Sequence, residues 1–562
     1  MAMSDNDFNK FDILSDKDFL KLVQRLYENN INKSIYHDFD LDKKQKFIRE
    51  IFTRLHLFDS NSINLCLKTL CLLIQEREEV DVFVGSSVLE LLQKLSGLES
   101  NKVDVNPIDI QSTIEAEKFM SYLISMSPKV EKFYSASGVA DAITHRIKET
   151  TETKLNDVIR FFDMRMLFLL TALNPDMRQR VREKFHGLSY LFEIINQIML
   201  SKSDLIASAD SGIILSNSDI DYLIEILKTL YNLTYSYTIQ EEEEEAHLMR
   251  LVSILRELIL CYETKDEKKI ELQKHIINLL TNLPSICYEE LLSPIVPEDE
   301  NEYDEHDGKN MKAIYIILQF LDYQITKNDG TKNAKEALSP VLELLISMCQ
   351  SNRTIRKYCQ QYILSSLSQE VFDSSTDEQT LRNKLTRQMT NPNSELKTLS
   401  AKLLFVLCKE NVNCLIKYTG CENAVMLLRD FGILNLKDKS NKDQYSSDSD
   451  ESDSENYQTI IDRYKFDPTN RTNIELSEDQ IQHYSFERST IETEKSLHNF
   501  NCVIDYDKIK TMINDPNEKL IPFENDRELH ETNFNLKQSC SNILNSSESS
   551  DDEDHLITTK KT

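Results

Sequence analysis

Strongly apolar helical segments recur through the first 440 residues of the chain, and each closes in a short polar cluster. In DYLIEILKTLYNLTYS each of five apolar residues has another three or four positions away: Leu223, Ile226, Leu227, Leu230 and Leu233. This interval places their side chains on one stripe of an α-helix. Segments of the same kind lie at 273–285, 337–352 and 396–411, so the pattern predicts many helices that each bury one face.

Polar segments of uneven length separate these helices, among them EEEEE at 241–245 and VPEDENEYDEHDGKN at 296–310. Core helices that recur behind variable loops are typical of armadillo and HEAT solenoids, whose units bury their apolar faces on neighbours. We therefore predict an all-α, armadillo/HEAT-like repeat superhelix over residues 1–440. The inner helices of such a fold line an extended groove, which indicates binding of a peptide or a helix.

Glycine is scarce, because the chain has nine glycines and no two lie within ten positions of each other. The phosphate-binding patterns GxxxxGK[ST] and GxGxxG are both incompatible with this spacing. Scarce glycine and proline also disfavour an all-β fold with many tight turns. The sequence therefore predicts a helical protein without a nucleotide loop and without a cofactor.

Acidic residues outnumber basic ones and give a net charge of −29, which argues against a nucleic-acid-binding protein. Residues 441–562 hold 27 acidic and 13 basic residues, so this last fifth of the chain carries about half of the net charge. The boundary is a run of serines and acids that cannot bury apolar surface. We expect an acidic serine-rich segment at 441–465 and a largely disordered tail at 466–562.

The most apolar stretch, FFDMRMLFLLTALNPDMRQRVREKF at 161–185, does not predict a membrane span. A span needs about 20 consecutive apolar residues, and Asp163 and Arg165 interrupt this run. The acidic N-terminus also lacks the pattern of a signal peptide. The 11 cysteines include no CxxC pair, so we predict buried reduced thiols and no metal site. We expect a cytoplasmic protein that is monomeric when alone and that is recruited to the cell cortex or plasma membrane.

Two asparagines and one basic cluster are candidate partner-binding residues. Asn232 and Asn282 occupy the same place in two helices, where a side-chain amide could pair with the main chain of a ligand. The alternative is that each amide only caps its helix end. Arg353, Arg356 and Lys357 lie close together on one predicted helix, where they could bind a carboxylate or simply face solvent.

Within the apolar stretch, four consecutive residues, Leu167 to Leu170, are predicted to be core. Three arginines begin the next helix and are expected to face solvent: Arg178, Arg180 and Arg182. Phe162 and Arg165 remain candidates for the groove.

Four stretches in this order resemble the synembryn family: FFDMRMLFLLTAL at 161–173, LLTNLPSIC at 279–287, LRNKLTRQMT at 381–390 and LLFVLCKENVNCLIKYTG at 403–420. The resemblance extends over roughly residues 10–465, and the acidic serines at 444–457 also match. Tyr122 stands where the family carries a groove asparagine. The segment 476–497 resembles the family's distal helix.

The resemblance implies a cytosolic chaperone and guanine nucleotide exchange factor for heterotrimeric G protein α subunits (Gα). The groove would take the C-terminal helix of GDP-bound Gα, promote GDP release and hold the nucleotide-free form until GTP binds. Arg353, Arg356 and Lys357 match a basic cluster that faces the end of this helix in the family. Such a protein acts by binding, without covalent catalysis. The alternatives are a generic armadillo scaffold or transport adaptor without exchange activity, or a metabolic enzyme, for which no catalytic constellation is recognisable.

Acidic residues three positions after Ser447, Ser452, Ser549 and Ser550 match the requirement of an acidophilic kinase of the casein kinase 2 type. In the family the corresponding segment is phosphorylated and activity rises. We therefore predict that such a kinase modifies the serines of this run and of the C-terminal cluster: Ser446, Ser447, Ser449, Ser452, Ser549 and Ser550. The alternative is an unmodified solubilising tail.

Overall fold

The computed structural model describes residues 13–30, 41–74, 80, 85–99, 102–104, 109–149, 155–203, 214–235, 242–263, 266–295, 305–364, 380–420 and 423. The predicted acidic segment at 441–465 and the tail at 466–562, with its helix at 476–497, lie outside these residues. All six candidate phosphorylation serines also lie outside them.

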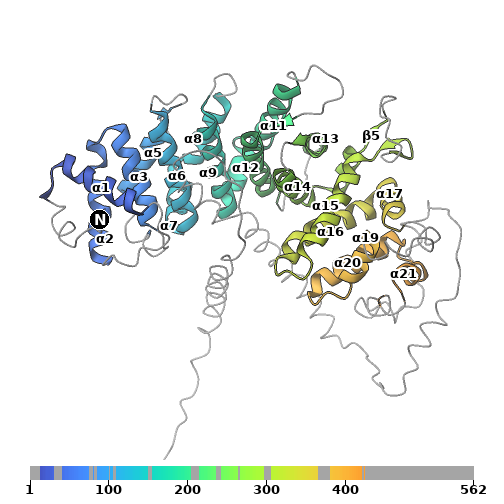
Figure 1. Ribbon diagram of the computed structural model, residues 1–562. Coiled ribbons are helices and arrows are strands. Elements are labelled where there is room, and N and C mark those ends of the chain that lie inside the picture. Colours follow the sequence, from blue (N-terminus) through green and yellow to red (C-terminus); the bar gives the residue numbers. More distant parts are fainter. Residues whose placement is uncertain are drawn as a thin grey trace, which may run out of the picture. The chain divides into compact units, whose positions relative to one another are not determined.

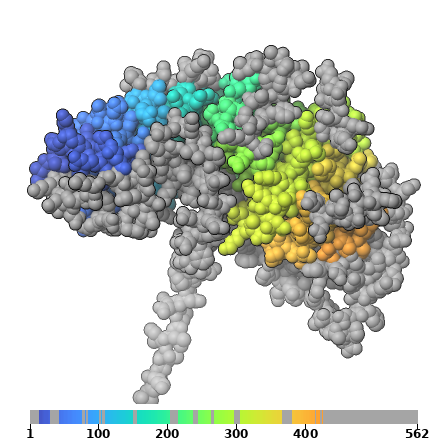
Figure 2. Space-filling model, viewed as in Figure 1, coloured from blue at the N-terminus to red at the C-terminus, as the bar shows by residue number. Residues whose placement is uncertain are grey.

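Long helices stack side by side in one row, so that each packs against the member before it (Figure 1). These row helices are α3 (Ser60–Leu73), α6 (Ile110–Met126), α9 (Asp157–Leu173), α12 (Asn217–Thr234), α14 (Asp266–Thr281), α16 (Ala334–Ser351) and α20 (Ser394–Leu407). The space-filling view in Figure 2 shows the same order, because the colours of the described residues change steadily from blue to orange. Neighbours along the chain are thus neighbours in space, as in a solenoid.

Further helices flank the row and cover its sides. They are α1 (Asp16–Asn30), α2 (Leu41–Arg54), η2 (Leu55–Leu57), α5 (Ser86–Leu95), α7 (Pro128–Ser137), α8 (Val139–Glu149), α10 (Pro175–Glu183), α11 (Gly187–Ser203), α13 (Glu242–Leu260), η3 (Ser285–Leu291), α15 (Lys312–Asn328), α17 (Arg353–Ile363), α19 (Leu381–Gln388) and α21 (Val412–Thr419). Among them, α8 packs on α9, α15 and α17 pack on α16, and α19 packs on α20.

The described strands are two residues long and join loops rather than form a core. β1 (Leu98–Glu99) pairs antiparallel with β2 (Lys102–Val103), and β3 (Ile214–Leu215) pairs parallel with β4 (Tyr262–Glu263). β7 (Lys309–Asn310) lies between β5 (Ser293–Pro294) and β6 (Glu305–His306), antiparallel to both.

Polar residues set where the helices begin. The side chain of Asp59 accepts a hydrogen bond from the backbone N–H of Ser62 in the first turn of α3, and Ser216 forms a capping box with Asp219 at the start of α12. Gly138, with φ of 83°, ends α7 in a left-handed conformation and allows α8 to begin at the next residue.

Buried apolar side chains form one nearly continuous cluster from α1 to α21. The residues predicted as core in the apolar stretch belong to it: Leu167, Phe168, Leu169 and Leu170 are at most 2% exposed. The five segments that the sequence predicted as apolar helices lie in α9, α12, α14, α16 and α20. For the described residues, the predicted all-α solenoid of the armadillo/HEAT kind is therefore confirmed.

Candidate functional site

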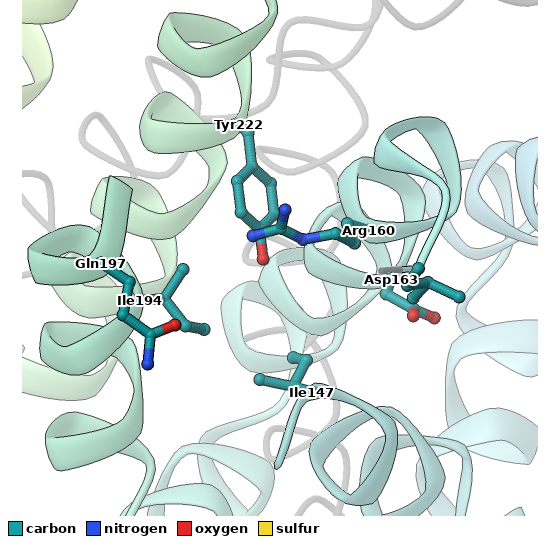
Figure 3. Close-up of a pocket in the computed structure, with 7 residues that line it drawn as sticks. Ile147, Arg160, Asp163, Ile194, Gln197 and Tyr222 are labelled. Atoms are coloured by element: carbon teal, nitrogen blue, oxygen red, sulfur yellow. The ribbon is translucent and has the colours of Figure 1, made fainter. Parts of the chain in front are cut away.

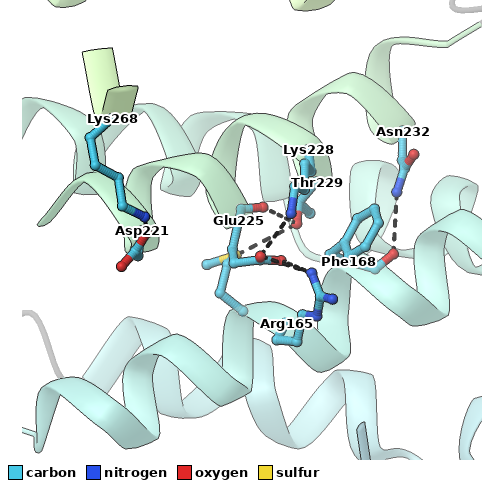
Figure 4. A network of polar contacts seen from close by, with 9 residues as sticks. Arg165, Phe168, Asp221, Glu225, Lys228, Thr229, Asn232 and Lys268 are labelled. Atoms are coloured by element: carbon cyan, nitrogen blue, oxygen red, sulfur yellow. Dashed lines mark hydrogen bonds and ion pairs between the residues drawn. The ribbon is translucent and has the colours of Figure 1, made fainter. Parts of the chain in front are cut away.

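The side-chain amide of Asn232, near the end of α12, connects this helix to the preceding row helix. Its Nδ2 donates to the carbonyl of Phe168 at 3.2 Å (Figure 4) and to Oγ1 of Thr171 at 3.1 Å. Asn232 is 6% exposed, so both bonds form away from water. The amide protons that the sequence suggested for a ligand's main chain are thus engaged inside the row.

Two further residues make the same kind of contact. Nδ2 of Asn282, directly after α14, donates to the carbonyl of Tyr231 at 3.0 Å, and the hydroxyl of Tyr122 on α6 donates to the carbonyl of Ile74 at 2.6 Å. Ile74 caps the C-terminal end of α3, and Phe168 and Tyr231 lie in the last two turns of α9 and α12, so each carbonyl lies at or near the C-terminal end of the preceding row helix. We call these three contacts the row joints: α3–α6 through Tyr122, α9–α12 through Asn232 and α12–α14 through Asn282.

The basic cluster on α17 divides into one buried and two more accessible residues. Arg356 is 4% exposed, and its Nη1 donates to the carbonyl of Cys349 at the end of α16 at 2.8 Å. Asn352, four residues earlier, caps α17 through the N–H of Ile355. Arg353 is exposed and Lys357 is half-buried. These two are therefore better placed than Arg356 to contact a partner.

The prediction that Arg178, Arg180 and Arg182 face solvent is wrong. All three are half-buried on α10, and each donates to an acceptor on a neighbouring element. The bonds run from Arg178 Nε to Thr171 O at 2.7 Å, from Arg180 Nη2 to Asp141 Oδ2 at 2.5 Å, and from Arg182 Nη1 to Leu233 O at 2.9 Å. Two of these acceptors are carbonyls near the ends of row helices, which explains why polar side chains lie there.

Arg165 on α9 is part of a buried cluster with more cations than anions, which we call the cation-rich cluster (Figure 4). Its Nη1 lies 2.9 Å from Glu225 Oε1, and Nζ of Lys228 lies 2.9 Å from the same oxygen. All three side chains are 5–6% exposed. Burial raises the pKa of Glu225, but Arg165 and Lys228 lower it by more than burial raises it. The pKa of Glu225 therefore falls below its ordinary value.

A second ion pair crosses the next joint of the row. Lys268 on α14 pairs with Asp221, one turn before Glu225 on α12. Burial lowers the pKa of Lys268, but Asp221 and Glu271 raise it above its ordinary value. Charged side chains and Asn232 therefore follow one face of α12, where they meet side chains of α9 and α14 (Figure 4).

A different cluster, which we call the acid-rich cluster, lies between α6, α8 and α9. Arg146 is 0% exposed, and its Nη1 lies 2.7 Å from Glu117 and 3.2 Å from Asp163. Its Nη2 donates to the carbonyl of Ser96 at 2.6 Å. Burial raises the pKa of Asp163 to about 6 despite the opposing effect of Arg146. Burial and the charge of Asp163 also raise the pKa of Glu117 well above its ordinary range.

A small hollow lies beside Asp163 (Figure 3). It has about 20 Å³ of space, enough for about one water molecule. The lining residues are Ile147, Leu155, Arg160, Asp163, Ile194, Gln197 and Tyr222. The guanidinium of Arg160 lies 4.7 Å from the ring centre of Tyr222, which narrows the space. The hollow is too small for an organic ligand.

Phe162, the other groove candidate on α9, is 6% exposed and packs in a small apolar cluster of its own with Ile114, Leu155 and Ile159. Nζ of Lys118 on α6 lies 5.7 Å from the centre of the Phe162 ring. The ring therefore connects α6 to α9 by packing.

Sequence reasoning missed the acid-rich cluster, although one signal pointed to it. Asp163 stands out as a charge within an apolar helix, and a charge in such a position needs a buried partner. The partner itself, Arg146, comes from another helix. Among the described residues, no group of histidine, cysteine and acidic side chains could hold a metal ion. No helix in this part of the chain is long and apolar enough to cross a membrane.

Comparison with known proteins gives a consistent result. A family model described as guanine nucleotide exchange factor synembryn matches residues 66–464. Chaperone Ric-8A of Xenopus tropicalis is 34% identical over 399 residues, which are 70% of this chain and 72% of that protein. Chaperone Ric-8A of Gallus gallus is 30% identical over 467 residues, covering 82% of this chain and 84% of its own. Chaperone Ric-8B of Rattus norvegicus is 29% identical over 447 residues, which are 74% of this chain and 85% of that protein.

Proposed function

This chain belongs to the synembryn family of guanine nucleotide exchange factors, and from that membership we infer that it is an exchange factor and chaperone for G protein α subunits. The observation that carries this conclusion is the extent of the match, because residues 66–464 include every row helix from α6 to α20 and most of α3. The described row is therefore the part of the chain that the relatives share.

We propose that one face of the row helices binds the C-terminal helix of Gα. Withdrawing that helix from the guanine-nucleotide domain lets GDP leave, and the row holds the nucleotide-free form until GTP binds. This mechanism needs only a surface with different affinities for two states of the partner. It requires no nucleophile, metal or phosphate loop, so the chain would act without covalent catalysis.

Within this proposal, Arg353 and Lys357 contact the carboxylate end of the Gα helix. Their accessibility on α17 supports this role, as does the preference of carboxylates for charge-assisted hydrogen bonds. The other candidates would shape the face instead, because their side chains are engaged between helices: Arg356, Asn232, Asn282, Arg165 and Phe162.

The test of exchange is the rate of GDP release from purified Gα proteins. This chain has no tryptophan, so tryptophan fluorescence of Gα can be followed without background. We expect faster release with at least one Gα class. A scaffold or transport adaptor would bind peptides and leave release unchanged, so no acceleration across all Gα classes would refute the proposal.

The test of the contact residues is charge reversal, Arg353→Glu with Lys357→Glu. We expect affinity for Gα to fall at least about tenfold, or about 1.4 kcal/mol, with the melting temperature nearly unchanged. The matched control is Lys17→Glu with Arg25→Glu, which changes the charge equally at exposed positions of α1. Equal affinities of the two variants would assign Arg353 and Lys357 to a solvated surface.

We further propose that an acidophilic kinase of the casein kinase 2 type phosphorylates the acidic serine segment and raises exchange. Each phosphate adds about −1.5 to −2 charge and could pair with basic residues at the end of the row. Alanine at Ser446, Ser447, Ser449 and Ser452 should abolish the increase and preserve basal binding. Unchanged exchange by protein shown to be phosphorylated would make the segment a passive linker. The cytoplasm, with recruitment to the cell cortex or plasma membrane, is the location we propose.

A further inference from the structure

Glu289, an exposed residue of η3, contacts two other elements through its two carboxylate oxygens. Oε2 accepts a hydrogen bond from Nδ2 of Asn352 at 2.5 Å, and Oε1 forms an ion pair with Nζ of Lys309 on β7. These partners are 63 and 20 positions away in the sequence. The carboxylate therefore connects three segments of the chain: η3, the start of α17 and the small sheet of β5, β7 and β6.

Asn352 is the N-cap of α17, and its side-chain amide is engaged on both sides. Its Oδ1 accepts from the backbone N–H of Ile355 at 3.0 Å, while its Nδ2 donates to Glu289. The carbonyl of Asn352 accepts from the N–H of Arg356 at 3.0 Å. A cap of this kind satisfies N–H groups that have no acceptor within the helix, and a carboxylate at this end interacts favourably with the helix dipole. Glu289 therefore helps to set the direction in which α17 begins.

The hairpin of β6 and β7 supplies a second contact with α17. Its two-residue turn at 307–308 has positive φ at both residues, 50° and 72°, which is typical of the tightest hairpins and pairs His306 with Lys309. Residues paired across two strands place their side chains on the same face of the sheet. Lys309 contacts Glu289, and the centre of the His306 ring lies 6.1 Å from that of Tyr358 on α17. The hairpin thus adjoins α17 beyond its first turn as well.

The two accessible cations of α17 follow this cap. Arg353 comes directly after Asn352, and Lys357 lies four residues later. Residues four apart lie on the same face of a helix, so the direction of α17 decides where both charges point. We propose that Glu289 is a positioning residue, which sets the direction in which Arg353 and Lys357 meet the carboxylate end of the Gα helix. This inference rests on the function proposed above for these two cations.

The charge of Glu289 has the wrong sign for direct contact with a carboxylate. By itself it would weaken the attraction of Arg353 for an anion, because like charges repel. Removing the charge would therefore combine an electrostatic gain in affinity with a loss of geometry. A variant that keeps the charge and changes only the reach of the side chain separates the two effects.

Glu289→Asp is this variant. It shortens the side chain by one methylene, so that one carboxylate no longer reaches both Asn352 and Lys309. The matched control is Glu290→Asp, at the next residue of η3. Oε2 of Glu290 accepts a hydrogen bond from Oγ of Ser253 at 2.8 Å, and Ser253 belongs to α13 rather than α17.

The first measurement is amide hydrogen exchange in the folded full-length variants without Gα, read by mass spectrometry of peptides from α17. We expect the amides of Ile355 and Arg356 to exchange at least about threefold faster in Glu289→Asp than in the natural chain. Their acceptors are the side chain and the carbonyl of Asn352. Glu290→Asp should leave them unchanged, and peptides from α3 should show that both variants are folded. Equal exchange in Glu289→Asp and the natural chain would overturn the proposal.

The second measurement is affinity for Gα. Glu289→Asp should bind at least about threefold more weakly than the natural chain, whereas Glu290→Asp should bind equally well. In a chain that already carries Arg353→Ala and Lys357→Ala, Glu289→Asp should have no further effect, because it acts through these residues. Additive losses, or unchanged affinity despite faster amide exchange, would overturn the positioning role. If the natural chain binds no Gα, the proposed function fails, and the amide exchange still decides whether Glu289 holds α17.

Discussion

Two charges on one helix, Asp163 and Arg165, lie two residues apart on α9 and belong to buried clusters of opposite composition. Asp163 joins the acid-rich cluster, where one guanidinium faces two carboxylates, and Arg165 joins the cation-rich cluster, where two cations face one carboxylate. Because successive helical residues are about 100° apart, residues i and i+2 point to nearly opposite sides. α9 therefore presents one cluster to α6 and α8 and the other to α12.

The two clusters show that burial alone does not decide how a carboxylate titrates. Asp163 and Glu225 are both almost fully buried, at 1% and 5% side-chain exposure. The pKa of Asp163 nevertheless rises to about 6, and that of Glu225 falls below its ordinary value. Burial acts in the same direction on both, so the number of neighbouring cations accounts for the difference.

The largest effect is expected from removing Arg146, the single cation of the acid-rich cluster. Arg146→Met leaves Glu117 and Asp163 buried without a counter-charge, so we expect a loss of about 3–5 kcal/mol in the free energy of unfolding. Urea unfolding followed by circular dichroism measures the loss. Lys21→Met, which removes an exposed pair with Asp18, should cost far less, because surface ion pairs contribute little to stability. Similar losses of unfolding free energy in the two variants would show that Arg146 does not stabilise the buried carboxylates of Glu117 and Asp163.

Removing the single anion of the other cluster should have a somewhat smaller effect. Glu225→Gln leaves Arg165 and Lys228 facing each other, and we expect a loss of about 3 kcal/mol, the lower end of the range for a broken buried pair. The flexible stem of Lys228 can carry its charge toward water. The double variant Glu225→Gln with Lys228→Met should recover part of the loss. If the loss in the double variant instead equals the sum of the losses in the two single variants, Glu225 and Lys228 do not interact.

The pH dependence of stability should differ in sign between the clusters. The pKa of Asp163 is ordinarily 3.8 and rises to about 6 in the fold, so the folded chain binds more protons than the unfolded chain between these two values. Its contribution is complete below 3.8 and is lost as pH rises to about 6, at a slope on the order of 1 kcal/mol per pH unit. The lowered pKa of Glu225 gives the opposite slope, with stability lost as pH falls below 4.5.

The measurement is the difference in unfolding free energy between the natural chain and Asp163→Asn across this window. The variant cannot titrate at position 163, so the difference should change steadily with pH. A difference that stays constant would mean that Asp163 keeps one protonation state throughout.

The smallest effect belongs to a neutral contact at the same α9–α12 joint. Asn232→Ala removes two hydrogen bonds from a buried amide and should cost about 1 kcal/mol, and Asn282→Ala, which is half-buried, should cost less. Thermal unfolding and Gα affinity are measured together. Loss of affinity without loss of stability in the Asn232 variant would restore the ligand-contact role that the sequence first suggested.

Local patterns in the sequence predicted the helices well, because an apolar stripe at intervals of three or four depends only on neighbours along the chain. Leu167 to Leu170 are core for this reason. The family resemblance was also local, since it rested on short stretches in a fixed order. These features required no knowledge of which helices meet.

The polar contacts could not be predicted in the same way, because each depends on the three-dimensional position of a distant group. Arg146 is paired with residues 29 and 17 positions away, and Arg182 donates to a carbonyl 51 positions away. The sequence suggested that Arg178 and Arg356 face solvent, because clustered basic residues usually lie on a solvated surface. The carbonyls that they satisfy at helix ends are not visible in the sequence.

Tyr122 has a consequence for how such chains can diverge. At the α3–α6 joint a phenol donates to the preceding helix, as the amides of Asn232 and Asn282 do at theirs. What this position requires is a proton donor that reaches one carbonyl, and several residue types can supply it. Substitution between them over evolutionary time would preserve the architecture while erasing identity in an alignment. Relatives of this chain are therefore better recognised by a hydrogen-bond donor at each row joint than by the type of residue that supplies it.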